Sequence, residues 1–228
     1  MITVAMVLCF GTAANATVSV TSAYFTYTST GPSGSTASDN LALASNGATA
    51  FAIDDINYTE HKISHLNDGY HGNSYSWIGE SSESIYLGGN LGDMGYMNAA
   101  YAGIALSTEY YITSFAFGRD NTGTYSDRVN GTYYIQITTD ATVDGNSTWT
   151  TIGTIEISDD DALRHVYTLT NSILATGLRI IVSDVGSATG TCIDEIEIYG
   201  TAVPEPAAFG LLASLLAFGA VVRERRRK

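Results

Sequence analysis

Two short stretches, Tyr133-Tyr134-Ile135-Gln136-Ile137-Thr138 and Leu178-Arg179-Ile180-Ile181-Val182, decide the fold of this 228-residue chain. Apolar residues occupy every second position in both of them. Successive side chains of a β-strand point to opposite faces, so a period of two places one face of the strand against a core. Both stretches are therefore predicted to be strands with one buried face.

Strand-like stretches recur outward from these two, separated by clusters of Gly, Asn, Asp and Ser. Helical periodicity is almost absent, and Ser29–Asn46 is a low-complexity stretch that predicts a loop. The spacing predicts an all-β domain of the sandwich or jelly-roll type. The predicted strands are Thr17–Tyr27, Ala48–Ile53, Ser84–Leu87, Ile104–Leu106, Tyr111–Phe117, Tyr133–Thr138, Thr150–Ile157, His165–Leu169, Leu178–Val182 and Cys192–Tyr199.

Charge is distributed unevenly along the chain, which has a formal net charge of −13. Half of its ten basic residues lie in the last six positions, Arg223–Lys228. Between Thr17 and Gly200, five basic residues accompany 21 acidic ones, which gives that segment a formal charge of −16. A surface this acidic repels phosphate, so the sequence excludes nucleic acid as a partner.

The first 16 residues are typical of a secretory signal peptide. Ile2–Phe10 is apolar, and Ala14-x-Ala16 is the small-residue pattern of a cleavage site. The alternative is an ordinary first β-strand. If the segment is removed, Cys9 leaves with it and Cys192 remains without an intramolecular disulfide partner.

The composition changes abruptly after Val203. Pro204-Glu205-Pro206 interrupts regular structure, Ala207–Val222 is a 16-residue run without charge, and Arg223–Lys228 closes the chain. As a helix the run would rise about 24 Å, slightly short of the hydrocarbon core, and its basic end would stay on the cytoplasmic side. The pattern predicts a single transmembrane helix, with a buried terminal helix as the alternative.

This tail, residues 203–228, resembles the PEP-CTERM sorting signal of exopolysaccharide-producing Gram-negative bacteria. The motif Val203, Pro204, Glu205, Pro206, the short apolar helix and the Arg cluster occur in the family's order. The resemblance implies export, transient anchoring in the inner membrane, and recognition by an exosortase-type sorting enzyme. It also implies a final location at the cell surface or in the extracellular matrix.

Three ordered motifs in the body of the chain resemble a discoidin (coagulation factor 5/8 type C) domain. They are Asn67-Asp68-Gly69 with Trp77, Arg119-Asp120 with Asp127-Arg128, and the ending Glu195-Ile196-Glu197-Ile198-Tyr199-Gly200. The resemblance implies a galactose-binding-like β-sandwich or jelly roll over residues 17–202. That fold is related to many carbohydrate-binding modules.

Calcium is the cofactor expected for this domain. Ca²⁺ takes six to eight oxygen ligands, and Asp68 followed by Gly69 supplies a carboxylate and a sharp turn. The discoidin resemblance implies one structural Ca²⁺ held by Asp68 and Glu195, by loop carbonyls near Tyr70 and Asn73, and by the Ser74 hydroxyl. The alternative is an Asx turn at Asn67-Asp68-Gly69 without an ion.

Candidate ligand-binding residues lie in the same loops. Arg128 offers a planar guanidinium to a sugar hydroxyl or carboxylate, and the rings of Tyr70 and Tyr75 could stack on a sugar. The alternative for the Arg119-Asp120 and Asp127-Arg128 pairs is a salt-bridged hairpin loop. We predict a structural role for Arg119, which follows an apolar strand, and leave Arg128 open.

The remaining candidates have simpler explanations. Trp77 and Trp149 are predicted to be core residues. His61, His65 and His71 lack the helical spacing of a zinc site. No Gly-x-Ser-x-Gly elbow is present, and Asp159–Asp161 predict a solvated turn.

The sequence therefore predicts an exported, surface-sorted, non-catalytic protein that binds carbohydrate or another matrix polymer. A structural component of the exopolysaccharide matrix without a discrete ligand site is the first alternative. A glycan-active enzyme is the second.

Overall fold

The computed structural model describes residues 18–30, 39–53, 61–71, 76–79, 100–120, 125, 128–158, 163–183 and 191–203. Within these residues the regular structure is β-strand, with two short 3₁₀ turns, η1 (Ala44–Asn46) and η2 (Ile63–Asn67). The strands are β1 (Val18–Thr21), β2 (Phe25–Thr30), β3 (Thr49–Ala52), β4 (Trp77–Gly79), β5 (Ala100–Gly118), β6 (Gly131–Thr138), β7 (Thr150–Ile157), β8 (His165–Ser183), β9 (Thr191–Ile193) and β10 (Glu195–Ala202).

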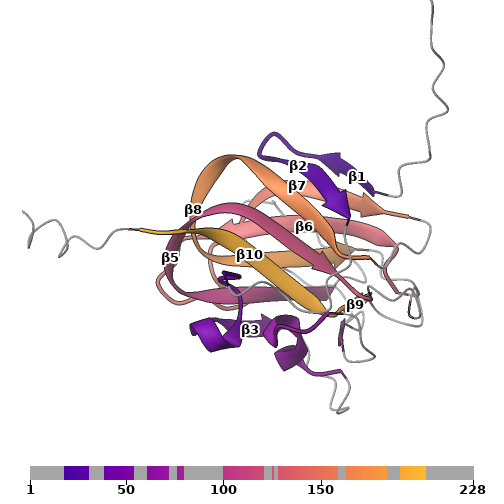
Figure 1. Cartoon of the computed structure of the whole chain (residues 1–228), viewed down its shortest axis with the longest axis horizontal. Helices are drawn as coiled ribbons and strands as arrows, with labels where there is room; N and C mark the ends of the chain where they lie inside the picture. The colour runs from indigo at the N-terminus through magenta and orange to yellow at the C-terminus, as the bar shows by residue number, and fades with distance from the viewer. Residues whose placement is uncertain are drawn as a thin grey trace, which may run out of the picture.

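Two 19-residue strands, β5 and β8, build both layers of the sandwich. They pair antiparallel along most of their length, with register shifts between Ala105 and Tyr110 and between Ile112 and Ser114. Their bends are visible at the left of Figure 1. One layer has the order β2-β8-β5-β10, and the other has the order β1-β7-β6-β8-β5-β3. The layers are therefore two parts of one continuous sheet.

The core lies between the inner faces of these layers. In the first layer, Phe25 packs edge-on against Phe115 at 5.1 Å between ring centroids, and Phe115 stacks on Tyr167 at 5.0 Å. In the second layer the alternation predicted from sequence is observed. Tyr133 and Ile135 of β6 are buried, as are the three alternating apolar residues of β8.

Several predicted strand boundaries are wrong, each for a local reason. Thr17–Tyr27 is broken at Ser22, whose Oγ accepts the N–H of Tyr24 and of Phe25 at 2.9 and 3.1 Å, turning the chain between β1 and β2. Cys192–Tyr199 is broken at Asp194, because β9 pairs with β4 while β10 pairs with β5.

The predicted pairs Ile104–Leu106 with Tyr111–Phe117 and His165–Leu169 with Leu178–Val182 are each one strand, β5 and β8. The predicted strand Ser84–Leu87 lies outside the described residues. So do the 1–16 segment and the tail from Pro204 onward.

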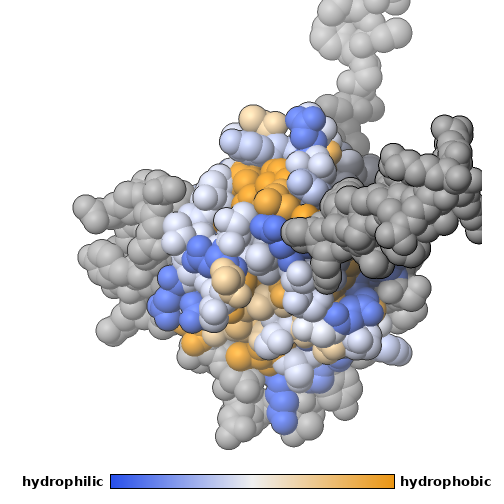
Figure 2. Space-filling model, turned by 90° about the vertical axis from the view of Figure 1, so that its left-hand side faces the viewer, coloured by the Kyte–Doolittle hydropathy of each residue, from blue (hydrophilic) through white to orange (hydrophobic). Residues whose placement is uncertain are grey.

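Figure 2 shows the face seen from the left of Figure 1, where apolar residues form separate patches among hydrophilic ones. Scattered apolar residues of this kind are ordinary for a protein surface. Within the described part of the chain, no helix has the length and hydropathy needed to span a membrane.

Candidate functional site

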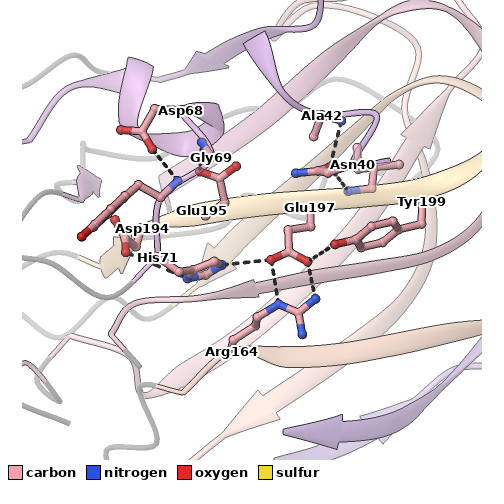
Figure 3. Close-up of polar contacts among 12 residues, drawn as sticks. Asn40, Ala42, Asp68, Gly69, His71, Arg164, Asp194, Glu195, Glu197 and Tyr199 are labelled. Carbon is pink, nitrogen blue, oxygen red and sulfur yellow. Dashed lines mark hydrogen bonds and ion pairs between the residues drawn. The ribbon is translucent and has the colours of Figure 1, made fainter. Parts of the chain in front are cut away.

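Alternation along β10 places three polar side chains on its outer face. Ile196 and Ile198 point into the core, so Glu195, Glu197 and Tyr199 point the other way. The free edge of β10 is covered by residues 40–42. Asn40 Oδ1 accepts the N–H of Ile198 at 2.9 Å, and the Leu41 N–H donates to the Ile198 carbonyl at 2.7 Å. Figure 3 shows Asn40 and Ala42 beside the strand that carries Glu195, Glu197 and Tyr199, and the other edge of this strand pairs with β5.

Glu197 is the centre of a buried network. Arg164 donates from both Nε and Nη2 to its two carboxylate oxygens, with the Nε bond at 2.7 Å. Tyr199 donates its hydroxyl to Oε2 at 2.6 Å. The ring of His71 completes the network, with Nε2 at 3.4 Å from Oε1, and its Nδ1 lies 3.9 Å from Asp194. The loop that carries His71 and the start of β8 are thereby tied to β10 (Figure 3).

The network keeps Glu197 ionised. Burial alone would raise the pKa of this carboxyl, but Arg164, His71 and Tyr199 together lower it to about 2. Burial and the neighbouring Glu197 charge raise the pKa of the Tyr199 hydroxyl. Glu197 is thus a fully engaged carboxylate with no exposed surface.

Glu195, two residues earlier, has the opposite environment. Its Oε2 accepts the Gly69 N–H at 3.1 Å, while its Oε1 is buried with no hydrogen-bond partner among the described residues. Burial raises the pKa of Glu195 to about 10 despite the Gly69 bond, and the nearby Asp68, Asp194 and Glu197 add to the rise. Without a cation this side chain is a neutral acid at pH 7.

Asp68 shows the Asx turn that the sequence left as an alternative. Its Oδ1 accepts the Tyr70 N–H at 2.9 Å, and its Oδ2 lies 3.0 Å from His65 Nδ1. Both oxygens therefore have a partner within the protein, although a carboxylate oxygen has more than one lone pair.

The residues present fit calcium in part. The orphaned Glu195 Oε1 is the acceptor that a cation would satisfy, and a bound cation would replace the proton of this carboxyl. No group of three or more His, Cys, Asp or Glu that could hold a metal occurs among the described residues. The other predicted ligands, Asn73 and Ser74, lie outside them, as does Tyr75.

The candidate ligand-binding residues are spread around this end of the domain. The Tyr70 ring is 52% exposed. Arg128 is partly buried with a left-handed backbone, φ 63°, and its carbonyl accepts the Cys192 N–H at 2.9 Å. Arg119 is buried, with its guanidinium 5.7 Å from the centroid of the Tyr125 ring. That position agrees with the structural role predicted for Arg119.

Trp77 and Trp149 are buried, as predicted. The three histidines have separate partners. His61 Nδ1 lies 2.9 Å from the Ser76 carbonyl, His65 contacts Asp68, and His71 contacts Glu197.

Sequence reasoning missed the Glu197 network. The alternation in Glu195–Tyr199 was a usable signal, because it puts both carboxylates and the tyrosine on one face of the strand. Arg164 carried no such signal, since it lies 33 positions from its partner.

Comparison with known proteins supports the fold. Neither a protein-family model nor a curated protein sequence matches this chain. Chitosan-binding module 1 of a Paenibacillus sp. IK-5 chitosanase/glucanase superposes with a TM-score of 0.51 at 20% identity, covering 71% of this chain and 98% of the module. Module 2 of the same enzyme, solved with chitotriose, gives 0.51 at 19% identity, covering 71% and 100%.

A family 32 carbohydrate-binding module from C. perfringens, in complex with galactose, is also similar. Its TM-score is 0.49 at 16% identity, covering 70% of this chain and 98% of the module. The two chitosan-binding modules show that the chain has a β-sandwich fold of the kind found in carbohydrate-binding modules.

Proposed function

We propose that this chain is an exported, surface-sorted, non-catalytic protein that binds carbohydrate. One observation carries the proposal: the described domain shares its fold with chitosan-binding modules over nearly their whole length. Fold alone never fixes function, so the site and the charge must support it. The buried state of Glu195, Glu197 and His71 favours a scaffold over a reaction centre, because substrate cannot reach them.

The charge of the domain narrows the class of glycan. With a formal charge of −16 between Thr17 and Gly200, the surface favours neutral or cationic sugars over uronic acids and sulfated chains. Arg128, Tyr70 and Tyr75 are the proposed contacts, with the exposed Tyr70 ring offering an apolar face to a sugar.

Calcium is proposed as a structural cofactor. Asp68 and Glu195 would supply carboxylate oxygens, joined by the carbonyls of Tyr70 and Asn73 and by the Ser74 hydroxyl. When bound, the ion would neutralise the carboxylates beside Gly69 and hold the loop against β10. The unsatisfied Glu195 Oε1 supports this assignment.

Sorting is proposed from the two ends of the chain. Residues 1–16 would direct export, and residues 203–228 would anchor the protein in the inner membrane until an exosortase-type enzyme acts near Val203–Pro206. A chain truncated before Val203 should be exported but never enter the membrane fraction. Recovery of truncated and full-length chains in the same membrane pool would contradict this part of the proposal.

A glycan array on residues 17–203, with and without chelator, tests the binding function. Saturable binding to one glycan class, lost or weakened in chelator, is the expected result. Absence of saturable binding would favour the matrix-component alternative. Turnover of exopolysaccharide in a hydrolase assay would favour the enzyme alternative.

A further inference from the structure

A small pocket lies where β6 ends and β7 begins, and it shares no residue with the β10 network. Its volume is about 140 Å³. The lining residues are Ile137, Thr138, Thr139, Asp140, Thr148 and Thr150. The residues around this small open cavity are thus four threonines, one aspartate and one isoleucine.

Asp140 is held in place by the loop around it. Its Oδ2 accepts the Thr148 N–H at 2.6 Å, and its own N–H donates to Thr138 Oγ1 at 3.1 Å. Thr176 Oγ1 donates to the Asp140 carbonyl at 2.7 Å. Oδ1 has no hydrogen-bond partner within the described chain. One carboxylate oxygen is therefore fixed and the other is available.

A buried arginine, Arg179, holds the loop between β6 and β7 against the sheet. Arg179 donates to the Gly145 carbonyl at 2.8 Å and to Gln136 Oε1 at 2.9 and 2.6 Å, and its guanidinium lies 4.5 Å from the centroid of the Trp149 ring. Trp149 Nε1 donates to the Asp144 carbonyl at 3.1 Å. The hairpin loop is thus fastened to the sheet, and such preorganisation lowers the entropic cost of binding.

We infer that this pocket is a subsite for one amino-sugar ring of a polymeric glycan. The proposal rests on the proposed carbohydrate-binding function and adds a second site with its own chemistry. Oδ1 of Asp140 would accept a charge-assisted hydrogen bond from a sugar ammonium, and the threonine hydroxyls would pair with ring hydroxyls. Ile137 is the apolar member of the lining. An uncompensated carboxylate and an acidic domain disfavour a uronic acid here.

The test is an NMR titration of residues 17–203 with chitotetraose, whose sugars carry free amines. Saturable shifts are expected at the amides of Thr138–Asp140 and Thr148–Thr150. Asp140→Asn keeps an acceptor for the Thr148 N–H but loses the charge, so affinity at this pocket should fall about tenfold. Asp144→Asn is the matched control in the same loop, because Asp144 does not line the pocket, and it should bind like the parent.

Two further probes test the sugar chemistry, and the Asp140→Asn titration separates the subsite from the proposed function. Fully N-acetylated tetramer should bind this pocket about tenfold more weakly, since it lacks the ammonium. A lysine-rich peptide that binds here as tightly as chitotetraose would overturn the assignment to a sugar. Retained binding in Asp140→Asn, or shifts confined to the β10 end, would overturn the subsite while leaving the proposed function standing.

Discussion

Each outer face of the sandwich carries one arginine, the half-buried Arg164 on one face and the fully buried Arg179 on the other, and the two are held in different ways. Arg164 is paired with the Glu197 carboxylate, whose pKa is lowered by that pairing, and Glu195 two residues earlier has a raised pKa because it is buried. Arg179 is held by an amide oxygen, a backbone carbonyl and two aromatic rings, those of Trp149 and Tyr101. We therefore expect the first face to be sensitive to pH and cations, whereas the partners that hold Arg179 on the second face are uncharged.

Replacing either arginine by alanine should cause the largest loss of unfolding free energy. The pH dependence of that loss should differ between the two faces. Arg164→Ala leaves Glu197 as a buried unpaired charge, which should cost about 3–5 kcal/mol of unfolding free energy at pH 7. The pKa of Glu197, about 2, lies below its ordinary value of 4.5, so this stabilisation is present above pH 4.5 and is lost as pH falls towards 2. The cost of the substitution should shrink over that window.

Arg179→Ala is the matched substitution on the other face. It should cost at least about 3 kcal/mol, because two acceptors lose a charged donor and Trp149 loses its stacked partner. This cost should stay constant with pH. Urea unfolding of both variants from pH 3 to 7 checks the pair, and parallel pH profiles would show that the comparison is wrong.

The next largest expected effect is the loss of unfolding free energy with rising pH that Glu195 causes. Its folded pKa of about 10 lies above the ordinary 4.5, so the stability it contributes is complete below pH 4.5 and is lost as pH rises towards 10. In chelator the protein should lose up to about 3 kcal/mol between pH 6 and 8. Glu195→Gln should remove this slope, and Ca²⁺ should remove it in the parent.

Urea midpoints at pH 6, 7 and 8 measure this slope directly. Asp144→Asn, on the Arg179 side of the molecule, is the control and should keep the slope of the parent. A flat parent profile in chelator would mean that Glu195 is already ionised in the folded protein.

Gly145→Ala affects only the outer face that carries Arg179. A Cβ at this position would lie 2.2 Å from Tyr101 Oη, so the loop or the ring must move. Overpacking of this kind should cost about 1–3 kcal/mol, independent of pH and calcium. Thermal melts with and without Ca²⁺ check this, and a calcium-dependent difference would show that the two faces are coupled.

Asp68→Ala should have the smallest effect without calcium. It removes an Asx turn and a partly exposed contact with His65, together worth about 1 kcal/mol or less. With Ca²⁺ it should remove most of the ion-dependent rise in melting temperature, because a ligand of the native state stabilises by mass action. An equal rise in the variant and the parent would exclude Asp68 from the calcium site.

The alternation of apolar and polar residues predicted most of the strands. It did not predict strands that continue through a bend, or strands whose outer face is covered by a loop. Ser107–Glu109 is polar and indicates a turn, yet β5 continues through it by shifting register at the bend. Arg179 alternates with apolar residues, a pattern typical of a side chain facing away from the core, yet it is buried beside Trp149.

The candidate site was predictable to the same limited degree. Glu195 followed from the motif that ends the domain, and the Asx turn followed from Asn67-Asp68-Gly69. The partnerships of Arg164 with Glu197 and of His71 with Asp194 depend on tertiary packing between distant segments. No local pattern encodes them.

The continuity of β5 through both layers has a mechanical consequence. β10 ends at the left of Figure 1, hydrogen-bonded to the bend of β5. Ladder hydrogen bonds run perpendicular to the strands, so a pull along β10 would load several of them at once in shear. Because β5 belongs to both layers, that load would pass into the whole sandwich. A domain tethered by its C-terminal end to a surface under flow would thus resist unravelling from its point of attachment.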